Sequence, residues 1–216
     1  MNEYAEEAVL TASRYAAVVR RPFASLALIL SLAACDPVTG TVVGGAAAVG
    51  VGAAEERGFE AAVDDAKIRT AINALYFDHD FDMYRGLTMT VTEGRVLLTG
   101  TVKRPEAHID AVRLAWQAAG VRQVIDEIQV TDKSDVTDYA TDVWIANNLR
   151  TRMMFDQNIR NINYTVDVVN GVVYLMGVAQ SQEELDRVLA HARDIGNVKR
   201  VINHVLLKTD PHRHNL

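Results

Sequence analysis

The sequence predicts an α+β fold in which an αββαβ unit occurs twice in tandem, each unit with two helices on a three-stranded mixed sheet. Two observations lead to this prediction. Shifting the chain by 77 positions aligns residues 62–132 with 139–209 without a gap. Within each copy, helical stripes and alternating strand patterns follow one another in the same order. We therefore expect two copies of one small domain, separated by a polar linker at 133–138.

Identical residues mark the repeat along most of its length. The matched pairs include Asp65/Asp142, Ile68/Ile145, Val91/Val168, Gly94/Gly171, Val96/Val173, Leu98/Leu175, Gly100/Gly177, Glu106/Glu183, Ala115/Ala192 and Val121/Val198. Most other pairs match apolar with apolar residues, so each copy is expected to have a core with the same arrangement of residues.

The first three elements of each copy follow from periodicity. In the first copy, apolar residues at a helical spacing predict a helix over 65–77. Residues 87–92 alternate between apolar and polar, as in a strand with one buried face. A second strand is expected at 95–102, after a turn at Glu93-Gly94. The second copy has Asn170-Gly171 at this turn, which is a strong hairpin signal because both central positions favour positive φ.

The last two elements have clear boundaries. Pro105 is suited to open a helix that Gly120 ends, and Ser181-x-x-Glu184 predicts a capping box at the same place in the second copy. A final strand is expected at 123–130 and at 200–207. Residues 210–216 form a polar tail, which we expect to be frayed.

The composition excludes several classes of protein. The chain has 216 residues, 49% of them apolar, a net charge of −6 and a single cysteine. One cysteine excludes an intramolecular disulfide framework and a cysteine-based zinc cluster. The negative charge disfavours a general binder of nucleic acid.

The single cysteine follows a segment that reads as a secretory signal. Arg20-Arg21 precedes an apolar stretch at 23–34, and small residues lead to Cys35. Leu32-Ala33-Ala34-Cys35 resembles the bacterial lipobox, which implies a cleaved signal at 1–34 and a lipidated Cys35 as the new N-terminus. Two or three acyl chains would anchor the protein durably. Residues 35–61, rich in small side chains, are expected to form a tether.

Two features qualify the signal. Glu3, Glu6 and Glu7 do not suit a basic n-region, so the translation start is expected nearer Val18. Asp36 resembles an inner-membrane retention signal of enteric bacteria, although the periplasmic face of the outer membrane remains the favoured location.

No catalytic or metal site is expected. Asp78-His79-Asp80-Phe81-Asp82 is rich in metal-ligating groups, but its counterpart at 155–159 keeps only one acid, so we expect a solvated loop. His191 and His204 have no acidic partner at an informative spacing. Beyond the signal, the serines are confined to the linker and a helix cap, which argues against nucleophilic catalysis. No cofactor-binding motif is present.

The hairpins and the closing strands resemble the BON domain family. The resemblance rests on Val-x-x-Gly-x-Val-x-Leu-x-Gly at 91–100 and 168–177, and on the related segments 121–126 and 198–203. Together with the lipobox, the pattern is similar to dual-BON envelope lipoproteins of Gram-negative bacteria. The resemblance implies a non-catalytic role in envelope integrity and binding of anionic phospholipid by the second domain.

A comparison of the two copies suggests where lipid would bind. Trp144 occupies the position of Lys67, which indicates an exposed aromatic side chain. Residues at helical spacing from Trp144, and the apolar and basic residues at the same helix end, suit a bilayer interface. The candidate lipid-binding residues are Trp144, Asn148, Arg150, Arg152, Met153 and Phe155, with Met154 beside them.

The charge of the two copies agrees with this choice. Residues 62–132 carry a net charge of −3, whereas residues 139–216 carry +1, so an anionic surface repels the second copy least. The alternatives are that Trp144 packs against the other domain, or that its face binds an envelope protein as an interaction or chaperone-like module.

Overall fold

The protein is described from a computed structural model that covers residues 54–131 and 136–213, within one compact unit that spans Gly45–Leu216. The predicted signal, Cys35 and Asp36 lie outside the described residues. The first copy comprises α3 (Gly58–His79), α4 (Phe81–Gly86), β1 (Leu87–Thr92), β2 (Arg95–Val102), α5 (Pro105–Ala115), β3 (Gln123–Asp126) and β4 (Gln129–Val130). The second comprises α6 (Val136–Phe155), η1 (Asn161–Asn163), β5 (Tyr164–Val169), β6 (Val172–Ala179), α7 (Gln182–Arg193), β7 (Arg200–Leu207) and η2 (Pro211–Arg213).

The two sheets have the same mixed topology, which confirms the predicted fold class. β1 pairs antiparallel with β2, which pairs parallel with β3 and β4. β6 likewise lies between antiparallel β5 and parallel β7. Both hairpin turns have positive φ at their two central residues, Glu93-Gly94 and Asn170-Gly171, as type I′ geometry requires.

The repeated aspartate at the start of each copy secures its hairpin turn. Asp65 on α3 accepts hydrogen bonds from the backbone N–H groups of Glu93 and Gly94, each at 2.8 Å. Asp142 on α6 does the same for Asn170 and Gly171, at 2.6 and 2.7 Å. Both aspartates are buried. Each therefore ties the first helix of its copy to the turn between the first two strands.

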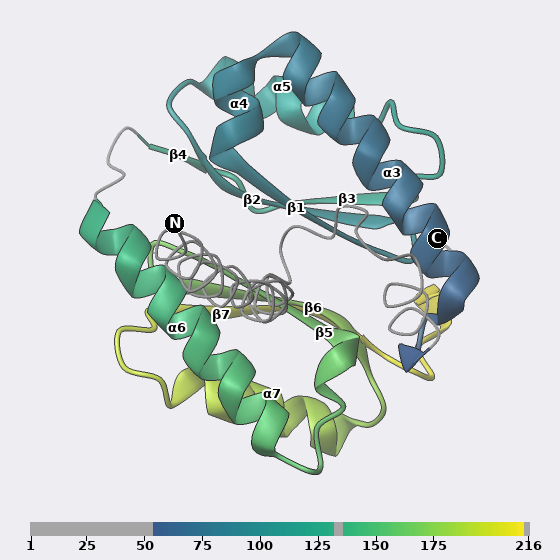
Figure 1. The fold of residues 1–216 in the computed structure, drawn as a ribbon, viewed down its shortest axis with the longest axis vertical. Coiled ribbons are helices and arrows are strands. Elements are labelled where there is room, and N and C mark those ends of the chain that lie inside the picture. Colours follow the sequence, from purple (N-terminus) through teal and green to yellow (C-terminus); the bar gives the residue numbers. More distant parts are fainter. Residues whose placement is uncertain (1–53, 132–135, 214–216) are drawn as a thin grey trace, which may run out of the picture. The chain divides into compact units, whose positions relative to one another are not determined.

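Helices cover one face of each sheet (Figure 1). In the first copy, Ile68, Ile72 and Tyr76 of α3 pack with residues of β2 and α5, and the buried Tyr76 hydroxyl donates to the carbonyl of Ala111 at 2.8 Å. In the second copy, Ile145 and Leu149 of α6 occupy the equivalent places against α7 and β6. The two cores thus use matching positions, as the repeat predicts.

The opposite faces of the sheets are also buried, because they pack against each other. Leu97 of β2 forms a separate apolar cluster with Val172, Tyr174 and Met176 of β6. All eight residues of β6 are buried. One buried face was expected for the strand at 87–92. The central strands β2 and β6 instead bury both faces, one against the helices of their own domain and one against the other sheet.

Three local features differ from the expectations. Residues 78–82 are not a loop: α3 continues to His79, and the Asp80 carboxylate caps α4 by accepting from the N–H groups of Asp82 and Met83. The strand expected at 123–130 is interrupted between β3 and β4, where the Asp126 carboxylate accepts from Ile128 N. Helix α6 already begins at Val136, within the segment expected to be a linker.

Within the described ranges, no helix is both long enough and apolar enough to cross a bilayer.

Candidate membrane interface

The solvent side of α6 carries the large exposed apolar side chains predicted for a membrane contact. Trp144 is 50% exposed and Phe155 is 77% exposed. They are eleven residues apart, which places them on nearly the same side of the helix, about 16 Å apart along its axis. Val143 and Met154 are also exposed and flank this side. We call Val143, Trp144, Met154 and Phe155 the α6 face.

Met153 does not belong to the α6 face, so this part of the prediction is wrong. Its side chain is 2% exposed and packs in the core with Ile145 and Leu149. The reason is the helical period: residues at positions 145, 149 and 153 follow one another at i+4 and line the side opposite Trp144.

Arg150 lies at the border between the α6 face and the adjacent strand β5. Its guanidinium donates to the carbonyl of Val166 on β5 at 2.6 Å, and burial lowers its pKa. This hydrogen bond ties α6 to β5, and a headgroup contact of Arg150 stays a prediction.

Asn148 and Arg152 form one edge of the helix beside the α6 face. Arg152 donates through Nε to the side-chain oxygen of Asn148 at 2.9 Å and pairs through Nη1 with Asp194 at 2.7 Å. The Asp194 side chain is largely exposed. Such surface pairs contribute little free energy, so the ion pair with Asp194 adds little to stability.

The first copy contains an exposed aromatic cluster that the sequence analysis missed. Phe77, Phe81 and Tyr84 make mutual ring contacts with centroids 5.7 to 6.2 Å apart, and the guanidinium of Arg85 lies 5.8 Å from the Phe81 ring centre. All three rings are exposed. Phe77 lies near the end of α3 and Phe81 and Tyr84 lie on α4, so the break at Asp80 between the two helices brings the rings together, and helical spacing alone did not predict it.

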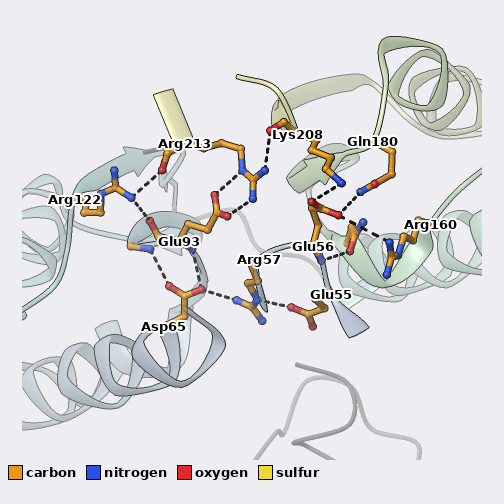
Figure 2. Close-up of polar contacts among 12 residues, drawn as sticks. Glu55, Glu56, Arg57, Asp65, Glu93, Arg122, Arg160, Gln180, Lys208 and Arg213 are labelled. Atoms are coloured by element: carbon orange, nitrogen blue, oxygen red, sulfur yellow. Dashed lines mark hydrogen bonds and ion pairs between the residues drawn. The ribbon is translucent and has the colours of Figure 1, made fainter. Parts of the chain in front are cut away.

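The two copies are joined by a polar network at the ends of their sheets (Figure 2). Arg213 of η2 donates to both carboxylate oxygens of Glu93 in the β1–β2 turn and to the carbonyl of Lys208. Arg122 donates to the carbonyl of Arg213 at 2.9 Å. Residues 210–213 are therefore fixed against the first copy, contrary to the frayed tail expected there, whereas His214 lies outside the described residues.

The histidines that appeared unpaired in the sequence have acidic partners in space. His204 Nε2 lies 3.0 Å from Glu127 of the other copy, and His191 Nε2 lies 3.0 Å from Asp156. His79 similarly contacts Asp110. In the part of the chain that the structure describes, no three histidine, cysteine or acidic side chains converge in a way that could hold a metal ion.

Asp167 of β5 is a half-buried carboxyl group that faces the other sheet. It accepts a hydrogen bond from the Thr99 hydroxyl of the other copy. Burial raises its pKa, although the Thr99 hydrogen bond opposes this shift. A carboxyl group whose pKa is raised by folding is more easily ionised in the unfolded chain. The free energy of unfolding therefore falls as the pH rises above the pKa of Asp in the unfolded chain, which is about 3.9.

We expect Asp167→Asn to increase the free energy of unfolding at pH 7, with a Tm a few degrees higher. The amide keeps an acceptor for Thr99 and removes the desolvated charge. The difference in free energy of unfolding between the variant and the parent should become smaller as the pH is lowered from about 7 to about 4.5. Urea denaturation at several pH values measures it. A variant less stable than the parent at pH 7 would show instead that attraction to Arg150 outweighs desolvation.

The repeated αββαβ unit, with helices on one face of each mixed sheet, defines a protein of two tandem α+β domains. Comparison with known families agrees with this architecture: the BON domain matches residues 64–132 and 141–209. The chain belongs to the BON domain family, with two copies of the domain.

Several curated proteins are similar to this chain. An uncharacterized protein in the gshII 5′ region of Anaplasma centrale is 44% identical over 148 residues, which are 68% of this chain and 96% of that protein. Osmotically-inducible protein Y of Escherichia coli is 28% identical over 68% of this chain and 74% of its own length. The outer membrane lipoprotein DolP of Haemophilus influenzae is 29% identical over 74% of this chain and 83% of its own length.

Among solved structures, CdsD of the Chlamydia trachomatis type III secretion system has 14% sequence identity. The match covers 64% of this chain and 90% of that chain, with a TM-score of 0.28.

Proposed function

We propose that this protein is a non-catalytic, lipid-anchored envelope protein that binds anionic phospholipid through its second BON domain and supports envelope integrity. The observation that carries the proposal is the α6 face, where Trp144, Met154 and Phe155 are exposed along one helix and Arg152 pairs with the exposed Asp194 beside them. Aromatic rings next to a guanidinium suit the headgroup region, where rings bury and cations meet phosphates.

The location rests on sequence and similarity. Cys35 in its lipobox would anchor the chain, and the outer membrane lipoprotein DolP and osmotically-inducible protein Y are similar to it. The periplasmic side of the outer membrane is the location we propose. Fractionation of the parent and a Cys35→Ala variant tests this: the parent should sediment with membranes and the variant should not. Equal sedimentation of both would contradict the anchor.

An alternative function is favoured by the aromatic cluster of Phe77, Phe81 and Tyr84. These rings are exposed in the first domain, where the surrounding charge is negative and an anionic bilayer would be repelled. A protein-interaction or chaperone-like role in the periplasm would use such a surface.

The lipid prediction concerns Trp144→Ala and Arg152→Glu. We expect each to weaken binding to vesicles that contain phosphatidylglycerol by about threefold to thirtyfold, because each removes an apolar contact or a favourable charge worth about 1 to 2 kcal/mol. Co-sedimentation with vesicles of increasing anionic lipid content measures the effect.

Trp116→Ala is the matched control, because Trp116 is 52% exposed at the end of α5 in the first domain. This variant should bind vesicles like the parent. Circular dichroism should show that all three variants are folded. If Trp144→Ala and Arg152→Glu bind as well as Trp116→Ala, the α6 face is not the lipid site.

A further inference from the structure

A small polar cavity lies where the two domains meet, beneath the segment that leads into α3. It has a volume of about 50 Å³, and its lining comes from both domains: Glu55, Glu56, Arg57, Arg69, Val91, Thr92, Ile162, Asn163, Thr165 and Val178. Since one water needs at least about 10 to 15 Å³ on this measure, the cavity has room for roughly three to five waters or for one small polyatomic ion.

Asn163 contributes a buried donor that has no acceptor. Its side-chain oxygen accepts from the backbone N–H of Glu56 at 2.9 Å, which fixes the orientation of the amide. The Nδ2 group is then left buried without a hydrogen-bond partner among the described residues. The residue is itself more than nine-tenths buried. An unsatisfied buried N–H group costs about 1 to 3 kcal/mol of stability. A ligand that accepts a hydrogen bond from Nδ2 would remove this cost.

Two guanidinium groups line the same cavity. Arg57 donates to Glu55, to Asp65 and to the carbonyl of Val91 through Nε and Nη1, which leaves Nη2 without an acceptor in the described ranges. Arg69 makes no hydrogen bond or ion pair within those ranges and experiences repulsion from Arg57. The cavity thus presents three sets of donors, and Arg69 is attracted to the carboxylates of Asp65 and Glu55 without a hydrogen bond to either among the described residues.

The carboxylates of the two glutamates at the cavity already form hydrogen bonds and ion pairs with other residues. Glu55 accepts from Arg57. Glu56 lies 3.1 Å from the ammonium of Lys208, accepts from Gln180 at 3.1 Å and is 3.9 Å from Arg160 (Figure 2). Both glutamates therefore already accept hydrogen bonds from other donors, and neither makes a hydrogen bond or ion pair with Arg69 in the described ranges.

We propose that this cavity is a binding site for a small oxyanion of the phosphate class, held by Arg69, by Nη2 of Arg57 and by Nδ2 of Asn163. The guanidinium groups and the amide supply donors only, and an oxyanion offers several acceptor oxygens. Because Arg57 and Arg69 belong to the first domain and Asn163 to the second, a bound oxyanion would tie the two domains together. The phosphate could be free inorganic phosphate or a lipid headgroup.

Thermal unfolding of the folded protein in inorganic phosphate tests the site. We expect a saturable rise in Tm with phosphate, above any rise in sodium chloride of equal ionic strength, because the oxyanion binds only the native state. Arg69→Gln and Asn163→Asp should each weaken the apparent affinity about tenfold or more, which is the loss of one charge-assisted hydrogen bond. Asn163→Asp keeps a side-chain oxygen that accepts from the backbone N–H of Glu56. Its negative charge would repel an anion in the cavity.

Arg85→Gln is the matched control, since it removes one exposed positive charge from the same domain beside Phe81. It should leave the phosphate effect unchanged. A second arm uses water-soluble dihexanoyl phosphatidic acid: a rise in Tm at lower concentration than with inorganic phosphate, lost in Arg69→Gln, identifies the lipid headgroup as the source. A phosphate effect no larger than that of chloride, or one that Arg85→Gln weakens as much as Arg69→Gln does, overturns the proposal. Vesicle binding through Trp144 is measured separately and does not depend on this outcome.

Discussion

Gly177→Ala should prevent the second domain from folding, or cost it at least about 4 kcal/mol of stability. Gly177 sits in β6 opposite Tyr164 with φ near +145°, and an added Cβ would lie 2.0 Å from the carbonyl oxygen of Asn163. That oxygen belongs to the backbone of η1 directly before β5, so the clash can be relieved only by moving the backbone where β5 begins to pair with β6. Urea denaturation followed by circular dichroism measures the loss.

Gly196→Ala is the matched control for this substitution. Gly196 lies in the same domain, has no positive φ, and an added Cβ would meet nothing within 4 Å. We expect a change of less than about 1 kcal/mol, and possible stabilisation through a less flexible unfolded chain. Gly100→Ala should repeat the large effect in the first domain, where the Cβ would lie 2.3 Å from Gly86 O. A native-like stability of Gly177→Ala would contradict this account of the repeated glycine.

Arg213→Met should cost about 3 to 5 kcal/mol, although Arg213 lies only three residues before the C-terminus. Its side chain is 6% exposed, and it holds Glu93 through two hydrogen bonds. The Glu93 carboxylate raises the pKa of Arg213, which shows how closely the two charges are matched. Removing the guanidinium leaves a buried carboxylate without its partner, and that desolvated charge dominates the cost.

Two further variants distinguish this explanation from a simple loss of contacts. Arg104→Met removes an exposed partner of Asp80 and should cost less than about 1 kcal/mol. Glu93→Gln combined with Arg213→Met should recover part of the stability lost in Arg213→Met alone, because it removes the unpaired charge. Urea midpoints and slopes of all variants give the comparison. An Arg213→Met cost equal to that of Arg104→Met would show that the pair is not effectively buried.

Local signals in the sequence predicted most of the fold. The hairpin turns follow from Glu93-Gly94 and Asn170-Gly171, whose φ values are positive as expected. Ser181 caps α7 through Glu184 N, as the capping box predicts, although the Glu184 carboxylate reaches Gln180 N and Arg160 N instead of returning to Ser181. Each of these signals acts within a few residues, which is why the sequence alone reveals it.

The packing of one sheet on the other was missed, although a signal was present. Residues 172–176 form a continuous apolar run, which is typical of a strand buried on both faces and not of an alternating strand. The ion pair of Glu93 and Arg213 had no such signal, because its partners are 120 positions apart. The same limit applies to Asn163 and Arg69, which only the folded chain brings to one cavity.

For the candidate membrane interface, Trp144 and Phe155 were predicted correctly as exposed, whereas Met153 was not. Trp144 was identified by comparison with Lys67 in the first copy, and Phe155 by its helical spacing from Trp144. Met153 was assigned by its closeness in sequence to Met154, and adjacent residues on a helix point about 100° apart. The helical positions of Ile145 and Leu149 already placed Met153 on the core side.

The contact between the two sheets also determines what the protein presents at a membrane. With the sheets in contact, the helices of each domain form the outer layers, α6 in one and α3 and α4 in the other. Three interlayer spacings of about 10 Å each would then separate them. A protein lying on a bilayer through α6 would hold the rings of Phe77, Phe81 and Tyr84 roughly 30 Å above the lipid, facing the aqueous compartment. If the proposed function holds, the aromatic cluster would remain accessible to a partner in solution while α6 contacts the lipid.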